Sequence, residues 1–393
     1  MRLLLFNLAT DASDPVLGFG SVWIRELARH CETIDVITMY RGVADLPSNV
    51  CVYSAGREHG WSKARRLATF YRVLTRLLSS RSYDVCFAHM MPLFAALAGP
   101  LLKARGIPLV LWYAHRQETR QLRLGAAMSW RAVTSVATSF PFPTDKLRVV
   151  GQGIDTDFYS PAEIPPTLNP CPHQEGGTFD LTKDVDTSFP PGGKHPPTAG
   201  DRGDGAGDGG NPLILQVARL AAIKHQATTI RALAGTEAQL VFVGGVQPGY
   251  AENYRRELEA LCAELGGGCH FTGDLPAAGV RDWNRRATVA VNTSPVGLFD
   301  KSALESMACA LPTVVCNPAF APVLGEQRDL LMIDGPQDVT GLRERLAHLL
   351  ALPEGERARI GRALRAGVMR EHSLKALIGR LLSVFESGEL PGE

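Results

Sequence analysis

One short segment places a lysine and a glutamate at the start of a predicted helix. Ser294–Pro312 reads SPVGLFDKSALESMACALP and follows the apolar run Thr288–Asn292. A helix that begins just after a strand presents free backbone N–H groups and the positive end of its dipole, which suit a diphosphate. Lys301 would add positive charge, and Glu305 could accept hydrogen bonds from a ribose diol. The alternative is an ordinary helix with an exposed glutamate.

Two more cations follow another apolar run, Leu213–Val217. Arg219 and Lys224 are five residues apart, so they could flank a diphosphate and neutralise the charge that develops on a leaving phosphate. The alternative is a pair of solvated cations. Glycines, which allow close approach of the backbone, end or follow the next two apolar runs. They are Gly244, Gly245 and Gly273.

The first half offers a glycine loop and two histidines. Gly18 and Gly20 in DPVLGFG form only G-x-G, and Trp23 stands where a dinucleotide-dehydrogenase fingerprint needs a third glycine. His115 and His89 each end a predicted strand, where an imidazole could hydrogen-bond a sugar hydroxyl. The alternative for each is a structural histidine.

Short apolar runs alternate with helical stretches in both halves, which predicts two parallel α/β sheets. Between the halves, residues 161–211 hold 10 glycines and 9 prolines, so we expect a disordered linker or insertion. The predicted domains are therefore residues 1–160 and 212–373, with a final helix at about 374–388 that packs back on the first domain. The predicted strands are Leu3–Leu8, Ile34–Met39, Val50–Ser54, Asp84–Ala88, Pro108–Tyr113, Ala132–Ala137, Leu213–Val217, Gln239–Val243, Cys269–Phe271, Thr288–Asn292, Thr313–Cys316 and Leu330–Ile333.

The order of these motifs resembles the order found in the retaining glycosyltransferases of family 4. Leu304–Pro312 is similar to the second half of the family's Glu-x7-Glu signature, and Val217–Leu220 with Lys224 resembles its Gly-Arg-Leu…Lys element. Gly151–Phe158 is similar to the segment before the family's interdomain linker. The first glutamate of the signature falls on Gly297, so either Asp300 or backbone N–H groups would contact the donor sugar instead.

The resemblance implies an α/β GT-B fold, with two Rossmann-like domains whose parallel sheets face an interdomain cleft. It also implies transfer of a sugar from a nucleotide sugar to a saccharide, lipid-linked or small-molecule acceptor, with retention and without a metal. Two other interpretations stand: an inactive sugar-nucleotide-binding or partner subunit, and a nucleotide-sugar epimerase. The site residues implied are His115, Asp300 and Glu305 for catalysis, and Gly18, Gly20, Arg219, Lys224, Gly244, Gly245, Gly273, Lys301, Ser302, Leu304 and Glu305 for the nucleotide.

Charge is distributed unevenly: residues 1–150 carry 19 Lys+Arg against 10 Asp+Glu. The stretch Ser62–Arg81 is a basic amphipathic helix that could rest on an anionic membrane; the alternative is that its apolar stripe packs on the sheet. We expect no nucleic-acid partner and a cytoplasmic protein, with contact to the cytoplasmic membrane face as a hypothesis. None of the eight cysteines forms a C-x-x-C pair, so we expect them to be reduced.

Overall fold

The computed structural model describes residues 1–14, 17–162, 211–246 and 252–392. Residues 1–161 and 212–393 form one compact unit. The segment predicted as a linker therefore lies outside the described residues, apart from its two ends.

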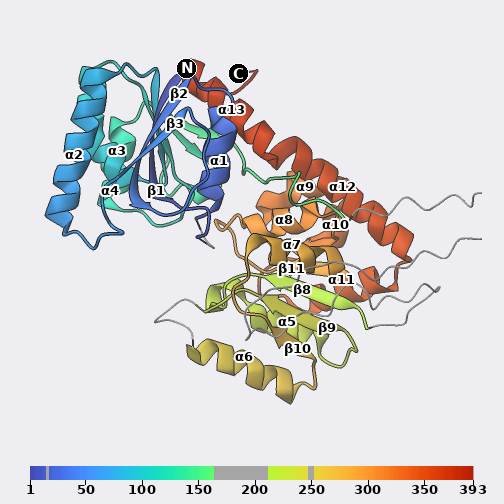
Figure 1. The fold of residues 1–393 in the computed structure, drawn as a ribbon. Coiled ribbons are helices and arrows are strands. Elements are labelled where there is room, and N and C mark those ends of the chain that lie inside the picture. Colours follow the sequence, from blue (N-terminus) through green and yellow to red (C-terminus); the bar gives the residue numbers. More distant parts are fainter. Residues whose placement is uncertain (15–16, 163–210, 247–251, 393) are drawn as a thin grey trace, which may run out of the picture. The chain divides into compact units, whose positions relative to one another are not determined.

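The first sheet has seven parallel strands in the order β3-β2-β1-β4-β5-β6-β7 (Figure 1). Its central strands are apolar runs that are buried on both sides, as parallel sheets require. Because all strands run in the same direction, their carboxyl ends meet at one edge. The strands are β1 (Arg2–Thr10), β2 (Thr33–Arg41), β3 (Val50–Ser54), β4 (Val85–His89), β5 (Leu109–Trp112), β6 (Arg131–Thr134) and β7 (Leu147–Val149).

Helices cover both faces of this sheet, with α2, α3 and α4 on one face and α1 and α13 on the other (Figure 1). Phe6 of β1 packs edge-on against Phe70 of α2, with ring centroids 5.8 Å apart. Leu5 points the opposite way and shares a core with Trp23 of α1 and Leu377 of α13. The helices are α1 (Phe19–Ala28), α2 (Lys63–Ser80), α3 (Pro92–Ala104), α4 (Arg120–Met128) and α13 (Leu374–Ser387).

The second sheet has five parallel strands in the order β10-β9-β8-β11-β12. Neighbouring side chains enter separate cores: Phe242 joins the larger cluster and Val243 the smaller one. The two sheets together confirm the predicted α/β fold. The strands are β8 (Leu213–Val217), β9 (Gln239–Val243), β10 (Cys269–Phe271), β11 (Val289–Asn292) and β12 (Thr313–Val315).

The end of the second half differs from the prediction at Leu330–Ile333, where a strand was expected. The structure has the short helix α10 there, and only Met332 forms a bridge, to Val315. A four-residue apolar run does not distinguish a short buried helix from a strand, so its type was ambiguous. The helices are α5 (Gln226–Leu233), α6 (Glu252–Glu264), α7 (Ala277–Arg286), α8 (Lys301–Ala308), α9 (Ala321–Leu324), α10 (Arg328–Leu331), α11 (Val339–Ala351) and α12 (Glu354–His372).

The basic helix α2 packs its apolar stripe on the first sheet, which is the second of the two interpretations given above. Phe70, Leu74 and Leu77 are buried in the core. The opposite face is exposed, and the helix contains no acidic residue. Its exposed cations are Lys63, Arg65, Arg72 and Arg76. In the parts of the chain that the structure describes, no helix combines the length and apolarity needed to cross a bilayer.

The expectation that all cysteines are reduced is wrong for one pair. Cys262 in α6 and Cys269 at the start of β10 form a disulfide. The spacing of seven residues did not suggest it, because only the turn after α6 brings the two side chains together. Among the described cysteines, Cys31, Cys86, Cys309 and Cys316 are free and buried, and Cys51 is free and exposed.

Candidate functional site

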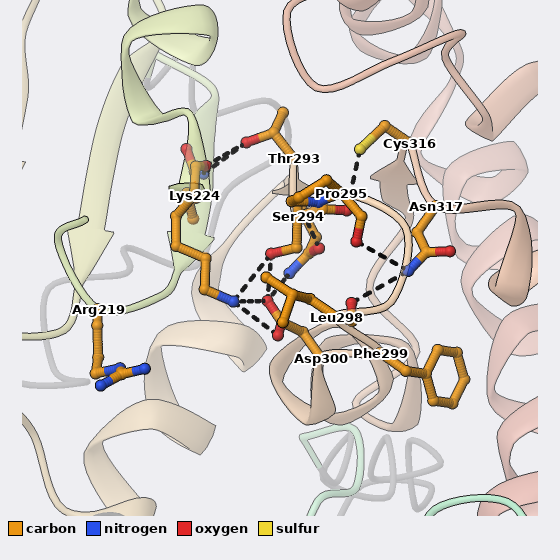
Figure 2. Close-up of polar contacts among 12 residues, drawn as sticks. Arg219, Lys224, Thr293, Ser294, Pro295, Leu298, Phe299, Asp300, Cys316 and Asn317 are labelled. Carbon is orange, nitrogen blue, oxygen red and sulfur yellow. Dashed lines mark hydrogen bonds and ion pairs between the residues drawn. The ribbon is translucent and has the colours of Figure 1, made fainter. Parts of the chain in front are cut away.

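The loop after β11 is held in place by side chains from neighbouring strands. Thr293 Oγ1 donates to the carbonyl oxygen of Lys224 at 2.7 Å. Asn317, after β12, donates its side-chain amide to the carbonyl oxygens of Pro295 (3.3 Å) and Leu298 (3.1 Å), as Figure 2 shows. These bonds come from both sides of β11, so the loop that leads into α8 has a defined conformation.

Asp300 and Lys224, both predicted site residues, form an ion pair at the start of α8. Lys224 Nζ lies 2.7 Å from Asp300 Oδ1 and 2.5 Å from Oδ2, and 3.1 Å from the Ser294 hydroxyl (Figure 2). The Asn292 amide and the Ser294 hydroxyl also donate to the Asp300 carboxylate. Both charged side chains are less than one-fifth exposed. The carboxylate is therefore committed to neighbours within its own domain.

Arg219 stands at the end of β8, five residues before Lys224. The side-chain amide of Gln226 donates to its carbonyl oxygen at 2.8 Å. The 3₁₀ turn Ala222–Lys224 then directs Lys224 towards the α8 loop. The Arg-Leu…Lys pattern thus supplies two cations after one strand, of which Lys224 reaches Asp300, the N-cap of α8.

Helix α8 begins with Asp300 as its N-cap, but the Asp300 side chain makes no capping hydrogen bond. The first-turn N–H groups are therefore not satisfied by a side-chain cap. Lys301 Nζ lies 3.9 Å from the centre of the Phe19 ring. Burial lowers the pKa of Lys301, and the neighbouring Glu305 opposes that shift. The other predicted residues of this helix are Ser302, which is partly exposed, and Leu304, which is buried.

Glu305 lies one turn after Lys301 and is half-buried. Burial raises the pKa of its carboxyl group, and the positive charge of Lys301 opposes that rise. The two side chains have the i,i+4 spacing at which opposite charges attract on a helix. A hydrogen-bond acceptor that is partly withdrawn from water is thus placed beside a cation.

The glycines after β9 and β10 pack against each other and against neighbouring loops. Gly244 donates its N–H to the Gly273 carbonyl at 3.0 Å, and a Cβ on Gly244 would lie 2.3 Å from the Ala218 carbonyl oxygen. The Gly245 N–H donates to Asp274 Oδ1 at 2.7 Å. The structure therefore places Gly244, Gly245 and Gly273 where backbone segments meet, next to the end of β8.

The glycine loop before α1 is compact where the structure describes it. Gly18 is the N-cap of α1 and donates its N–H to the Asp14 carbonyl at 2.9 Å. A Cβ at Gly18 would lie 2.6 Å from that oxygen, whereas one at Gly20 would have no atom closer than 3.8 Å. A side chain is therefore sterically excluded at Gly18, and Gly20 tolerates one.

The two candidate histidines have different surroundings. His89 is buried among Phe19, Trp23 and Trp112, and burial, with a smaller contribution from Lys301, lowers its pKa to about 3. An imidazole with so low a pKa is neutral at physiological pH, and this one packs as part of the core. His115 is exposed after β5, and its Nδ1 accepts the Gln117 N–H at 3.0 Å. Only His115 of the two is open to a ligand.

Arg116 is a residue that the motif comparison missed. Its Nη1 donates to the carbonyl oxygen of Val296 at 3.1 Å, which brings it beside Gly297. The sequence feature that could have identified Arg116 is its position directly after His115, at the end of a predicted strand. Sequence spacing alone could not relate it to a loop 180 residues away.

A metal cluster is absent from the described residues, since none of their His, Cys, Asp and Glu side chains forms a group of three that could hold an ion. The one Asp-x-Asp pattern before the linker is used locally. Asp155 accepts the backbone N–H groups of Asp157 and Phe158, and Asp157 pairs with Lys375.

Solved structures with the same topology match nearly the whole chain. HepE (Alr3699) from Anabaena, in complex with UDP and glucose, has a TM-score of 0.69 and 14% identity, and the match covers 98% of this chain and 100% of that one. Sucrose-phosphate synthase from Thermosynechococcus elongatus has a TM-score of 0.70 and 15% identity, with 98% of each chain covered. The fold is GT-B. At these identities the structural likeness shows the GT-B fold alone.

A third GT-B structure is the lipopolysaccharide outer core galactosyltransferase WaaB in its apo form. Its TM-score is 0.61 and its identity 14%, with 99% of this chain and 100% of that one covered. In sequence, residues 211–351 match the family Glycosyl transferases group 1. That range contains β8 to β12 and the Lys224–Asp300 pair. A comparison with curated proteins finds no match.

Proposed function

We propose that this chain is a retaining hexosyltransferase that moves a sugar from a nucleoside diphosphate sugar to an acceptor hydroxyl. The acceptor would be a polysaccharide, a lipid-linked saccharide or another glycoconjugate. The observation that carries the proposal is the Lys224–Asp300 ion pair, which joins the segment after β8 to the N-cap of α8, the helix that follows β11. The family match over residues 211–351 supports it, as does the GT-B likeness to HepE, which was solved with UDP and glucose.

In this proposal the diphosphate binds at the N-terminus of α8. Lys224 has three N–H donors, which Asp300 and Ser294 occupy in the structure, so a phosphate oxygen would replace one of these contacts. Arg219 would flank the other side and stabilise the charge on the leaving group. These groups supply the positive charge that a metal provides in other sugar transferases, so we propose that no metal is required. Turnover should then be unchanged by a chelator.

Glu305 is assigned to the ribose. Its raised pKa reflects a partly dehydrated carboxylate, which forms stronger hydrogen bonds than an exposed one. Protonation would remove one of its two acceptor oxygens. Donor affinity is therefore expected to fall with decreasing pH, and the fall should begin at a higher pH than it would for an exposed glutamate.

The chemical step proposed is front-face transfer. Asp300 is bound to Lys224, Ser294 and Asn292, so it is poorly placed to act as a covalent nucleophile. The bond from the anomeric carbon to the phosphate oxygen breaks while the acceptor oxygen bonds the same face of that carbon. The acceptor proton passes to the leaving phosphate oxygen. His115 would orient the sugar through a hydrogen bond.

Thermal-shift screening against UDP-, GDP- and ADP-sugars, followed by transfer assays, tests the proposal. A stabilising nucleotide sugar that is also turned over is the expected result. Glu305→Ala should weaken its binding, and Asp300→Ala should lower turnover because Lys224 loses the carboxylate that holds it at the start of α8. Unchanged behaviour in both variants would show that the site is elsewhere. Binding without transfer to any acceptor would favour an inactive sugar-nucleotide-binding subunit, and conversion of the free nucleotide sugar would favour an epimerase.

We propose in addition that α2 contacts anionic membrane by charge. Its four exposed cations face outward, while the buried apolar stripe leaves only Leu67, at 43% exposure, as a large apolar side chain on that face. Binding would therefore be weak and sensitive to salt. Sedimentation with phosphatidylglycerol vesicles should show binding at low ionic strength that Arg72→Glu/Arg76→Glu abolishes. No sedimentation at low salt would refute the contact.

A further inference from the structure

An arginine from the first sheet's edge fills the place beside Gly297. Arg116 follows β5, and its Nη1 donates to the Val296 carbonyl at 3.1 Å. A Cβ on Gly297 would lie 2.4 Å from Arg116 Cδ and 2.8 Å from Cγ. The Arg116 side chain therefore occupies the space that a side chain at position 297 would need.

The loop conformation at this point suits a glycine. Gly297 has φ +85°, in the left-handed region that L side chains rarely adopt. The Ser139 hydroxyl donates to the Gly297 carbonyl oxygen at 3.3 Å. Arg116 and Ser139 thus bind the carbonyl oxygens of two neighbouring residues, Val296 and Gly297, and Gly297 adds no side chain beside Arg116.

Arg116 carries a positive charge that no carboxylate neutralises among the residues the structure describes. Lys224, by contrast, is paired with Asp300. Glu118, two residues after Arg116, is bound to Arg123. Arg116 is exposed, and its one hydrogen bond to a carbonyl leaves most of its five N–H donors for a ligand.

We propose that Arg116 selects a donor whose sugar carries a carboxylate, that is, a nucleoside diphosphate hexuronic acid. This inference rests on the proposed function, in which His115, the residue directly before Arg116, orients the transferred sugar. A guanidinium binds a carboxylate through two parallel hydrogen bonds, a geometry that a neutral hydroxymethyl group cannot match. The hydrogen bond to the Val296 carbonyl oxygen holds the Arg116 guanidinium group in place before the donor binds. Arg116 is therefore a specificity-determining residue of the donor site.

The test uses donor pairs that differ only in the sugar's C6 group: UDP-glucose with UDP-glucuronate, UDP-galactose with UDP-galacturonate, and GDP-mannose with GDP-mannuronate. Affinities are measured by calorimetry on the full chain, together with those of UDP and GDP. We expect one uronate to bind at least about 10-fold more tightly than its neutral partner. Arg116→Ala should reduce that ratio to near 1 without changing the affinity for the nucleoside diphosphate. Arg116→Lys should give an intermediate ratio.

Arg120→Ala is the matched control, because Arg120 is exposed four residues later and should keep the full ratio. The inference is overturned if neutral sugars bind as well as uronates, or if Arg116→Ala keeps the preference. In both cases the proposed function survives, since nucleotide sugars still bind. If no nucleotide sugar and no nucleoside diphosphate binds, the proposed function itself fails, and the inference fails with it.

Discussion

The loops after β5 and after β11 differ in how they are held. The loop from Thr293 to Asp300 is held by hydrogen bonds to Gln216 of β8, to Lys224 of the 3₁₀ turn Ala222–Lys224 and to Asn317 after β12, and by the Lys224–Asp300 ion pair. The loop after β5 is exposed from His115 to Glu118, and Arg116 is its link to the α8 loop. In the proposed function, the loop that binds the diphosphate is therefore held by several contacts, whereas the residues proposed to contact the sugar lie on an exposed loop.

Lys224→Ala should produce the largest effect. It removes a cation from the proposed diphosphate site and leaves the Asp300 carboxylate, only 18% exposed, without its partner. We expect kcat/KM to fall about 1000-fold and the free energy of unfolding to fall by about 3 kcal/mol. Transfer kinetics and urea unfolding measure the two effects.

Two further variants separate catalysis from stability for this pair. Lys224→Ala/Asp300→Asn should recover much of the lost stability, because no lone charge stays buried, but it should not recover turnover. Lys375→Ala breaks the exposed pair with Asp157, whose side chains are 69% and 78% exposed. It should change stability by no more than about 0.5 kcal/mol. Equal losses of stability in the two alanine variants would contradict the assignment of the Lys224–Asp300 pair as a buried pair that holds the loop before α8.

His115→Ala probes the open loop. Since its side chain is exposed, we expect no change in thermal stability, while kcat falls about 100-fold. The matched control is His59→Ala, an exposed histidine in the same domain, which should leave kcat unchanged. A loss of stability with kcat intact would place His115 among the structural residues instead.

Glu305→Gln should weaken donor binding about 10-fold, because one charged acceptor is replaced by a neutral one. The pH dependence gives a sharper test. Burial raises the pKa of Glu305 above its ordinary value of 4.5, so the carboxylate is lost at a higher pH than in an exposed glutamate. Donor affinity of the wild type should therefore fall as the pH drops through that raised pKa. Calorimetry on Glu305→Gln should show no such fall over the same range.

His89→Phe should have the smallest effect, confined to the pH dependence of stability. The folded state holds His89 neutral down to a pKa of about 3, whereas the unfolded chain binds a proton near 6.5. Its contribution is therefore complete above pH 6.5 and decreases as the pH falls towards 3. Removing it should lower the slope of unfolding free energy against pH by up to about 1.4 kcal/mol per unit. An unchanged slope between pH 6.5 and 5 would contradict the buried, neutral state.

Much of the fold was predictable because buried parallel strands are apolar runs with clear boundaries. The runs at Leu213–Val217 and Gln239–Val243 became β8 and β9 with the predicted bounds. The strand predicted at Leu330–Ile333 was wrong because Leu330 and Leu331 end the short helix α10, and a four-residue apolar run does not distinguish a buried helix end from a strand. The Cys262–Cys269 disulfide was missed because its geometry depends on how α6 ends.

The sequence by itself determined which residues stand at strand ends: Arg219, Lys224, His115 and the segment before Glu305 are set by chain order and apolar periodicity. Tertiary structure decided what those residues contact. Asp300 is 76 positions from Lys224, and Arg116 is 180 from Val296, so neither contact leaves a periodic pattern. Parallel pairing of β8 with β11 brings the ends of these two strands to one sheet edge, which places Lys224 beside Asp300. The Arg116–Val296 contact instead joins residues that follow strands of different sheets.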